Sequence, residues 1–241
     1  DSKLTVIVMN NLTDWANQPY RARDIGLLLA RVILAPPIAL PATTTAPIAA
    51  PTRQSTPEVI ANKVPIPPEA TFFEGKVDIG GRSLFLTCQG KGSPTIVCDA
   101  EVSQRGRYFL NSFDIAVPAD TRVCVYDRPN VAGGESDRSS RIRTSRDIVE
   151  ELRALLTKAG LKPPYVLIGH SLGGMNMTLF ATEYPAEVAG LILLDPLPPG
   201  TFEAWMKLVK SGAFPKESSS WIQNLLDGNF DGVSENLDLA E

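Results

Sequence analysis

The sequence of 241 residues predicts an α/β fold, in which helices cover both faces of a mostly parallel β-sheet. From residue 95 onward, short apolar runs alternate with longer amphipathic segments, as strands and helices do in such folds. The apolar runs lack the polar alternation of a strand that exposes one face to solvent. A glycine-rich turn that carries a serine joins one of these runs to the helical segment after it. Together these observations favour a sheet that is buried on both faces.

The first 70 residues differ in composition from the rest of the chain. Residues 1–34 contain a strand-like run, KLTVIVMNN, and a helix-like run, YRARDIGLLLARVIL, which we interpret as a strand–helix remnant of a preceding domain. Residues 35–70 are rich in proline, alanine and threonine, and we interpret them as a linker because proline removes backbone donors and fixes φ. Residues 21–50 share some features of a signal peptide, but Arg31 interrupts the apolar run.

Residues 71–199 are predicted to form the core domain. Gly80 and Gly81 predict a hairpin within GKVDIGGRSLFLTC. Further strands are predicted at PTIVCDA, TRVCVYDR, YVLIGH and AGLILLDP, and helices at residues 107–117, 144–160 and 172–184. Thr144 and Asp147 have the spacing of a capping box at the start of the second of these helices.

Composition excludes several classes of partner and site. The net charge of −4 gives no basic patch, so no nucleic-acid partner is expected. A membrane span is not expected either, since it would need about 20 uninterrupted apolar residues. Cys88, Cys98 and Cys124 lack metal-ligand spacing, and their odd number favours free thiols in the core over a disulfide framework. We expect no metal and no organic cofactor.

The stretch YVLIGHSLGGMNM suggests a nucleophile. In the pattern G-x-S-x-G a strand turns sharply into a helix, and the serine, here Ser171, stands at the apex in a strained conformation. Gly169 and Gly173 are needed because side chains there would collide with the neighbouring strand and helix. The first N–H groups of the helix favour a developing oxyanion, and the amide of Leu172 is the expected first donor.

Four segments resemble the N-terminal two-thirds of an α/β-hydrolase fold enzyme, over residues 72–198 and in the order of that superfamily. The segments are GKGSPTIVCDA, ADTRVCVYDRPNVAGGESD, PPYVLIGHSLGGMNM and PAEVAGLILLDP. The resemblance implies that Ser171 is the nucleophile. It also implies a second oxyanion N–H from the loop after the strand TIVCDA, which here would be that of Glu101 or Val102. Relatives usually have glycine near Glu101, so this chain departs from the pattern there.

His170 is the only histidine in the chain, and it directly precedes the serine. Neighbouring residues on a sharp turn project in different directions, so we interpret His170 as a packed residue at the strand end and not as the base. The superfamily order is serine, acid, histidine. Asp195, in LLDP, is the candidate acid, or else a turn-forming residue before proline. Asp127 and Arg128 are expected to fix a loop, with a substrate contact as the alternative.

The missing base is explained if the chain is a piece of a longer protein. It begins at Asp1 without a methionine and stops at Glu241 within a region, residues 200–241, that resembles the start of a helical cap. The resemblance therefore implies an α/β-hydrolase fold truncated in the cap region. Alone, the chain would lack the catalytic histidine, would expose a sheet edge, and would be inactive.

These observations predict a serine hydrolase that acts on a carboxylic ester or a related acyl bond of a small molecule. The alternatives are an acyltransferase with the same nucleophile and a non-catalytic relative that binds a ligand. Residues 1–34 faintly resemble the C-terminal end of a serine β-lactamase-like or penicillin-binding-like domain, which implies such a domain fused upstream. The compartment is not fixed by the sequence, although an extracytoplasmic one is favoured.

Overall fold

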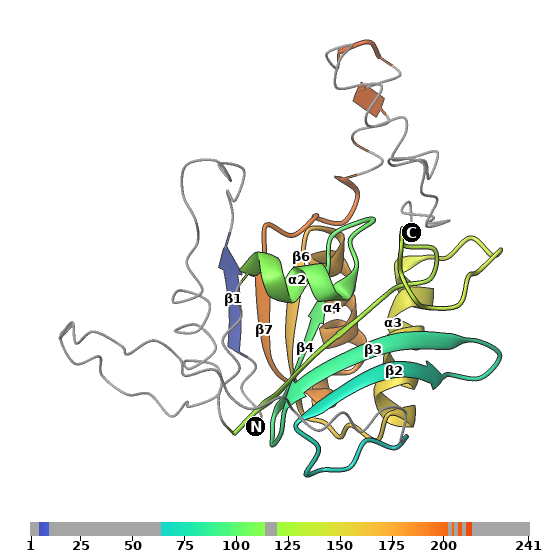
Figure 1. The fold of residues 1–241 in the computed structure, drawn as a ribbon. Helices are drawn as coiled ribbons and strands as arrows, with labels where there is room; N and C mark the ends of the chain where they lie inside the picture. Colours follow the sequence, from blue (N-terminus) through green and yellow to red (C-terminus); the bar gives the residue numbers. More distant parts are fainter. Residues whose placement is uncertain are drawn as a thin grey trace, which may run out of the picture.

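Seven strands form one sheet in the part of the chain that the computed structural model describes, which comprises residues 5–9, 64–113, 120–201, 204, 207–208 and 211–213 (Figure 1). The strands are β1 (Thr5–Met9), β2 (Phe72–Asp78), β3 (Ser83–Gly90), β4 (Thr95–Asp99), β5 (Arg122–Tyr126), β6 (Tyr165–His170) and β7 (Val188–Leu194). The helices are α2 (Gly106–Phe113), α3 (Ser145–Lys158), α4 (Leu172–Glu183) and the short 3₁₀ helix η1 (Pro185–Glu187).

The sheet is mostly parallel, as the sequence predicts. Its strand order is β1-β7-β6-β4-β5-β3-β2. Strands β1, β7, β6, β4 and β5 run parallel, whereas β3 runs antiparallel to both β5 and β2. The β2–β3 hairpin closes where Asp78 pairs with Ser83, around the predicted Gly80-Gly81 turn. The parallel strands place their carboxyl ends along one edge, where ligands bind in open α/β sheets.

Helices lie on both faces of the sheet (Figure 1). On one face, Leu152 of α3 and Phe180 of α4 share a buried cluster with Leu167 of β6. On the other face, Phe109 of α2 packs in a second cluster with Ile168 of the same strand. Successive residues of β6 therefore enter opposite cores, which explains why its sequence is apolar without a polar alternation.

Helix α3 begins at the capping box predicted from Thr144 and Asp147. The Thr144 hydroxyl accepts a hydrogen bond from the Asp147 N–H, and the Asp147 carboxylate accepts one from the Thr144 N–H. This exchange satisfies two backbone donors that a helix start otherwise leaves without partners. The buried positions of the helix then include Leu152, Leu155 and Leu156, which share a hydrophobic cluster with residues of the sheet.

The strand predicted near the N-terminus is present, and it joins the sheet of the core domain. Residues Thr5–Met9 pair in parallel with Gly190–Leu194 of β7. The edge of β7 is therefore covered by β1 in this structure. The helix predicted within residues 1–34, and the linker up to residue 63, lie outside the described residues. The division of the chain into domains stays a prediction.

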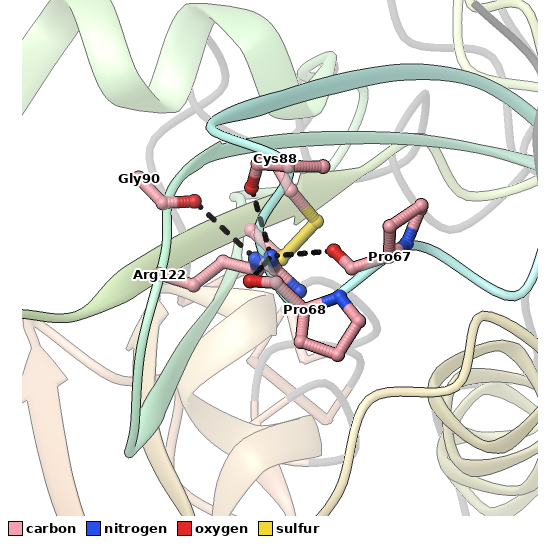
Figure 2. Close-up of a disulfide and its surroundings, with 7 residues drawn as sticks. Pro67, Pro68, Cys88, Gly90 and Arg122 are labelled. Carbon is pink, nitrogen blue, oxygen red and sulfur yellow. Dashed lines mark hydrogen bonds between the residues drawn. A yellow bond between two sulfur atoms is a disulfide. The ribbon is translucent and has the colours of Figure 1, made fainter. Parts of the chain in front are cut away.

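The start of the core domain is held by a buried arginine (Figure 2). Arg122, at the beginning of β5, is 5% exposed. Its guanidinium donates to the carbonyl oxygens of Gly90, Pro67, Pro68 and Ala70 at distances of 2.9 to 3.3 Å. Because carbonyl oxygens satisfy its donors, the charge can remain buried at this end of the strand.

The expectation of three free thiols is wrong for two of the cysteines. Cys88 of β3 and Cys124 of β5 form a disulfide across the antiparallel pair (Figure 2). The two residues lie directly opposite each other in the register, with Cα atoms 4.1 Å apart. Sequence spacing could not show this, because the register is set by the hairpin and the long connection between the strands. Cys98 is free and buried, as expected.

Removal of the disulfide should destabilise the domain without changing its fold. Cross-linking residues separated by 36 positions restricts the unfolded chain, and loops of such length correspond to about 3 to 4 kcal/mol of stability. We expect the Cys88→Ser, Cys124→Ser double variant to lose about this amount, measured by urea unfolding under oxidising conditions. In the control, Cys98→Ser, the disulfide remains and only a buried thiol is replaced. If the wild type unfolds at the same urea concentration with and without reductant, the prediction is contradicted.

Candidate active site

Ser171 stands between β6 and α4 with a backbone conformation that few residues other than glycine adopt. Its φ is 53° and its ψ is −116°. Its N–H donates to the Leu194 carbonyl oxygen at 3.1 Å, and its own carbonyl oxygen accepts from the Leu197 N–H at 3.0 Å. Ser171 is half-buried, so the side chain is not enclosed in the core. The sharp turn that the sequence predicts is therefore present.

The glycines around the serine are required by the close approach of backbone segments. A Cβ atom at Gly169 would lie 2.4 Å from the Gly173 carbonyl oxygen, and one at Gly173 would lie 2.2 Å from the Asp99 carbonyl oxygen. Both distances are far shorter than a van der Waals contact. At Gly174 the obstacle is Pro196, after β7. The first turn of α4 can thus reach the ends of β4 and β7 only without side chains at these positions.

The loop after β4 passes beside the start of α4. A Cβ atom on Gly173 would also meet the Ala100 carbonyl oxygen at 2.7 Å, so this loop and the serine turn are in direct contact. Glu101 and Val102, the two predicted oxyanion donors, follow immediately. Leu172 is the first residue of α4, and helix starts leave their first N–H groups without helical acceptors. The structure therefore brings the three predicted donors to one region.

A buried ion pair connects this loop to β5. Arg128 and Asp99 have side chains that are 1% and 0% exposed, and Nη1 of Arg128 lies 2.5 Å from Oδ1 of Asp99. Arg128 also donates to the carbonyl oxygens of Ala100, at 2.9 Å, and Glu101, at 2.6 Å. The second carboxylate oxygen of Asp99 accepts from Nδ2 of Asn176, a buried residue of α4, at 2.8 Å. These contacts join β4, β5 and α4 behind the serine turn.

Asp127 fixes a loop, as predicted. Its Oδ1 accepts from the Gly106 N–H at the start of α2, and its Oδ2 accepts from the Glu135 N–H. The Ser136 hydroxyl donates to the Asp127 carbonyl oxygen. Arg128 also fixes a loop, the one after β4. Asp99 and Asn176 were not predicted from the sequence, although opposite charges at the ends of two apolar strands could have indicated the Asp99–Arg128 pair.

His170 is buried at the end of β6, as predicted, and is 5% exposed. Its Nδ1 lies 3.8 Å from Oε2 of Glu101. Burial lowers the pKa of His170 to about 4, and the negative charge of Asp195 only partly opposes this effect. Burial also raises the pKa of Glu101, while the charge of Arg128 opposes that shift. At neutral pH the imidazole is therefore uncharged.

Asp195 follows β7 directly, and its backbone adopts a φ of 43°. Its neighbours in the chain bond to Ser171, because Leu194 accepts from the serine N–H and Leu197 donates to the serine carbonyl oxygen. Asp195 therefore lies beside the serine turn at the carboxyl edge of the sheet. Within the described part of the chain, no cluster of three or more metal-ligating side chains occurs and no helix could cross a membrane.

Comparison with known proteins identifies the same fold. A family model described as alpha/beta hydrolase fold matches residues 107–216. The crystal structure of VinJ superposes with a TM-score of 0.51 and 23% sequence identity, covering 70% of this chain and 58% of VinJ. Together with the sheet order and the serine turn, these matches confirm the resemblance to the α/β-hydrolase superfamily. The β-lactamase-like resemblance of residues 1–34 finds no support among them.

Two curated relatives match part of this chain over part of their own length. The uncharacterized protein YbdG of Bacillus subtilis is 30% identical over 142 residues, which are 53% of this chain and 40% of YbdG. RutD of Cronobacter sakazakii, whose name describes a carbamate hydrolase, is 30% identical over 104 residues, which are 43% of this chain and 38% of RutD. The chain thus spans about two fifths of the length of these relatives.

The low pKa of His170 should make stability fall in mild acid. Because the folded-state pKa of about 4 lies below the ordinary histidine pKa of 6.5, the unfolded chain binds a proton between these pH values that the folded chain does not. Stability should be level above pH 6.5 and fall by up to about 3 kcal/mol as the pH drops to 4. The free energy of unfolding is measured against pH for the wild type and for His170→Asn. The difference between the two curves isolates the effect of His170, because both proteins carry the same carboxylates.

Proton NMR offers a direct measurement, since the chain contains a single imidazole. Its resonance should titrate near pH 4 in the folded protein. A titration near 6.5 would show that the ring is hydrated in solution, and would contradict the burial that we describe.

Proposed function

We propose that this chain carries the nucleophile of a serine hydrolase that acts on a carboxylic ester or a related acyl bond. The backbone conformation of Ser171 is the observation that carries this proposal. Ser171 is half-buried, its backbone has a φ of 53°, and it lies between a buried strand and the start of a helix. This is the arrangement of the nucleophile elbow in α/β-hydrolases. The match to the family model and the name of RutD support a hydrolytic reaction.

In the proposed reaction, Oγ of Ser171 attacks the acyl carbon, and its proton passes to a histidine. The tetrahedral oxyanion accepts hydrogen bonds from the N–H of Leu172 and from that of Glu101 or Val102. When the intermediate collapses, the leaving alcohol takes the proton from the imidazolium and an acyl-enzyme forms on Ser171. Water then gives a proton to the histidine and attacks the acyl carbon, and the second tetrahedral intermediate collapses to release the carboxylic acid and return the proton to Oγ of Ser171. Asp195 is the proposed acid that orients the histidine and stabilises its charged form.

The histidine of this reaction is proposed to come from outside the 241 residues. His170 is buried at the end of β6 beside Glu101, and its low pKa reflects the absence of solvent around it. Residues 200–241 are proposed to begin a helical cap over the site. In their described part, Thr201, Ala204, Lys207 and Leu208 are helical, and the Ala204 N–H donates to the Gly200 carbonyl oxygen.

Two alternatives share the same elbow. An acyltransferase would use the same acyl-enzyme but release it to an alcohol or amine, and the product ratio with water and with such acceptors distinguishes it from a hydrolase. A non-catalytic relative would bind a ligand without turnover. The partner is in each case a small acyl compound, and neither a metal nor an organic cofactor enters the proposal.

Two further parts of the proposal concern the protein as a whole. The Cys88–Cys124 disulfide favours an oxidising, extracytoplasmic compartment, since cytosolic proteins usually keep their thiols reduced. We also retain the proposal that a β-lactamase-like domain is fused upstream of the linker. Sequencing the gene on both sides of this segment tests both the fusion and the downstream histidine.

Substitution of the nucleophile should abolish turnover. In the full-length protein, Ser171→Ala should reduce the hydrolysis of p-nitrophenyl esters by at least about 10³-fold, because only binding and the oxyanion donors remain. It should also abolish covalent labelling by a fluorophosphonate. Ser93→Ala, an exposed serine before β4, is the matched control and should retain both properties. Undiminished ester turnover by Ser171→Ala would remove this serine from the mechanism.

The 241-residue chain by itself should show little or no esterase activity, because no second histidine is present in it to act as the base. We expect its kcat/KM to be no higher than that of Ser171→Ala in the same chain. The comparison is made with both proteins folded, as checked by circular dichroism. Turnover by this chain that disappears in Ser171→Ala would place the base within these residues.

A further inference from the structure

We propose that Arg128 is a positioning residue, which aims the amide N–H groups of Glu101 and Val102 at the substrate's acyl oxygen. This inference rests on the proposed function, because it assigns a role in stabilising an oxyanion. The guanidinium does not touch the reacting atoms. It acts through two peptide groups of the loop that follows β4, and through the side chain of Asp99.

The two peptide groups are oriented by their carbonyl oxygens. In a trans peptide the C=O and the N–H point in opposite directions. The Ala100 carbonyl shares a peptide with the Glu101 N–H, and the Glu101 carbonyl shares one with the Val102 N–H. Arg128 binds both carbonyl oxygens, at 2.9 and 2.6 Å, so both N–H groups point away from it. Neither N–H donates to a backbone carbonyl oxygen in the described part of the chain.

The same guanidinium is fixed to the core on its other side. Its Nη1 binds Asp99 at 2.5 Å, and the opposite oxygen of that carboxylate accepts from Asn176. Asn176 lies on α4, five positions after Ser171 in the sequence. Arg128, Asp99 and Asn176 are all at most 2% exposed. The loop, β5 and the helix that begins at the serine are thus held in one arrangement by groups that water does not reach.

The oriented loop faces the serine turn at short range. The Asp99 and Ala100 carbonyl oxygens would lie 2.2 and 2.7 Å from a Cβ atom on Gly173, two residues after Ser171. A shift of this loop would therefore move the donors relative to the serine. Because oxyanion donors act only when they are fixed before charge develops, their orientation should appear in kcat more than in substrate binding.

Arginine suits this role better than lysine. The planar guanidinium reaches the Asp99 carboxylate and two carbonyl oxygens at fixed angles, whereas a lysine ammonium is a compact charge on a flexible stem. Arg128→Lys therefore keeps the positive charge beside Asp99 and removes the geometry. Arg122→Lys is the matched control, since Arg122 is also buried and also binds carbonyl oxygens, but at the opposite end of β5 (Figure 2).

The experiment compares these variants in the full-length protein. For each we measure kcat and KM with a p-nitrophenyl ester, the affinity for a trifluoromethyl ketone, which forms an oxyanion on the serine, and the midpoint of thermal unfolding. Arg128→Lys should lower kcat by about 10- to 100-fold and lower the affinity for the ketone by a similar factor, with little change in KM. Arg122→Lys should lower the unfolding midpoint but leave kcat and ketone affinity near their wild-type values.

Asn176→Ala provides a second variant if Arg128→Lys does not fold. It leaves the Arg128–Asp99 ion pair in place and removes the hydrogen bond from Asn176 to Asp99. It should lower kcat and the affinity for the ketone by similar factors. If the folded variants keep wild-type kcat and ketone affinity, or lose them only as far as Arg122→Lys does, the inference is overturned. If the proposed function itself is wrong, the result is different, because ester turnover then persists in Ser171→Ala.

Discussion

The backbone of Ser171 is the constraint on which the rest of the site depends. A non-glycine residue at a φ of 53° costs on the order of 1 to 3 kcal/mol, and it persists only where the surroundings fix it. Two hydrogen bonds with the segment after β7 do so, one from the Ser171 N–H to Leu194 and one from the Leu197 N–H to the Ser171 carbonyl oxygen. The strands must also be close enough to hold this bend, which is why backbone lies where side chains at Gly169 and Gly173 would be.

A buried arginine lies near each end of strand β5 and binds a neighbouring segment of the chain. Arg122 precedes its first apolar residue and Arg128 follows its last, and each binds carbonyl oxygens of a neighbouring segment. Arg122 has no carboxylate among the hydrogen-bond acceptors described here, whereas Arg128 has Asp99. Removing one partner of a buried pair is far more costly than breaking an exposed one. The exposed pairs, such as Arg153 with Glu187, contribute little by comparison.

Much of the fold follows from local patterns, whereas the connections between segments do not. The strand YVLIGH, the capped helix at Thr144 and the bend at Ser171 were predictable because periodicity, capping and glycine spacing act over a few residues. The Cys88–Cys124 disulfide and the bond from Asn176 to Asp99 depend on which strands and helices meet, and the residues they join are far apart in sequence. Arg128 was expected to fix a loop, but the sequence could not show that this is the loop after β4, for the same reason.

The place of β1 in the sheet limits how any additional strand can approach the serine. Thr5–Met9 occupies the hydrogen-bonding edge of β7, with Met9 opposite Leu194. A strand that extends the sheet on this side must pair with β1 instead of β7. A loop at its carboxyl end then starts about 4.8 Å farther from Ser171 than one that follows a direct neighbour of β7. The strand that pairs with β7 therefore determines how far a proton-accepting side chain on a more distant strand must extend to contact Ser171.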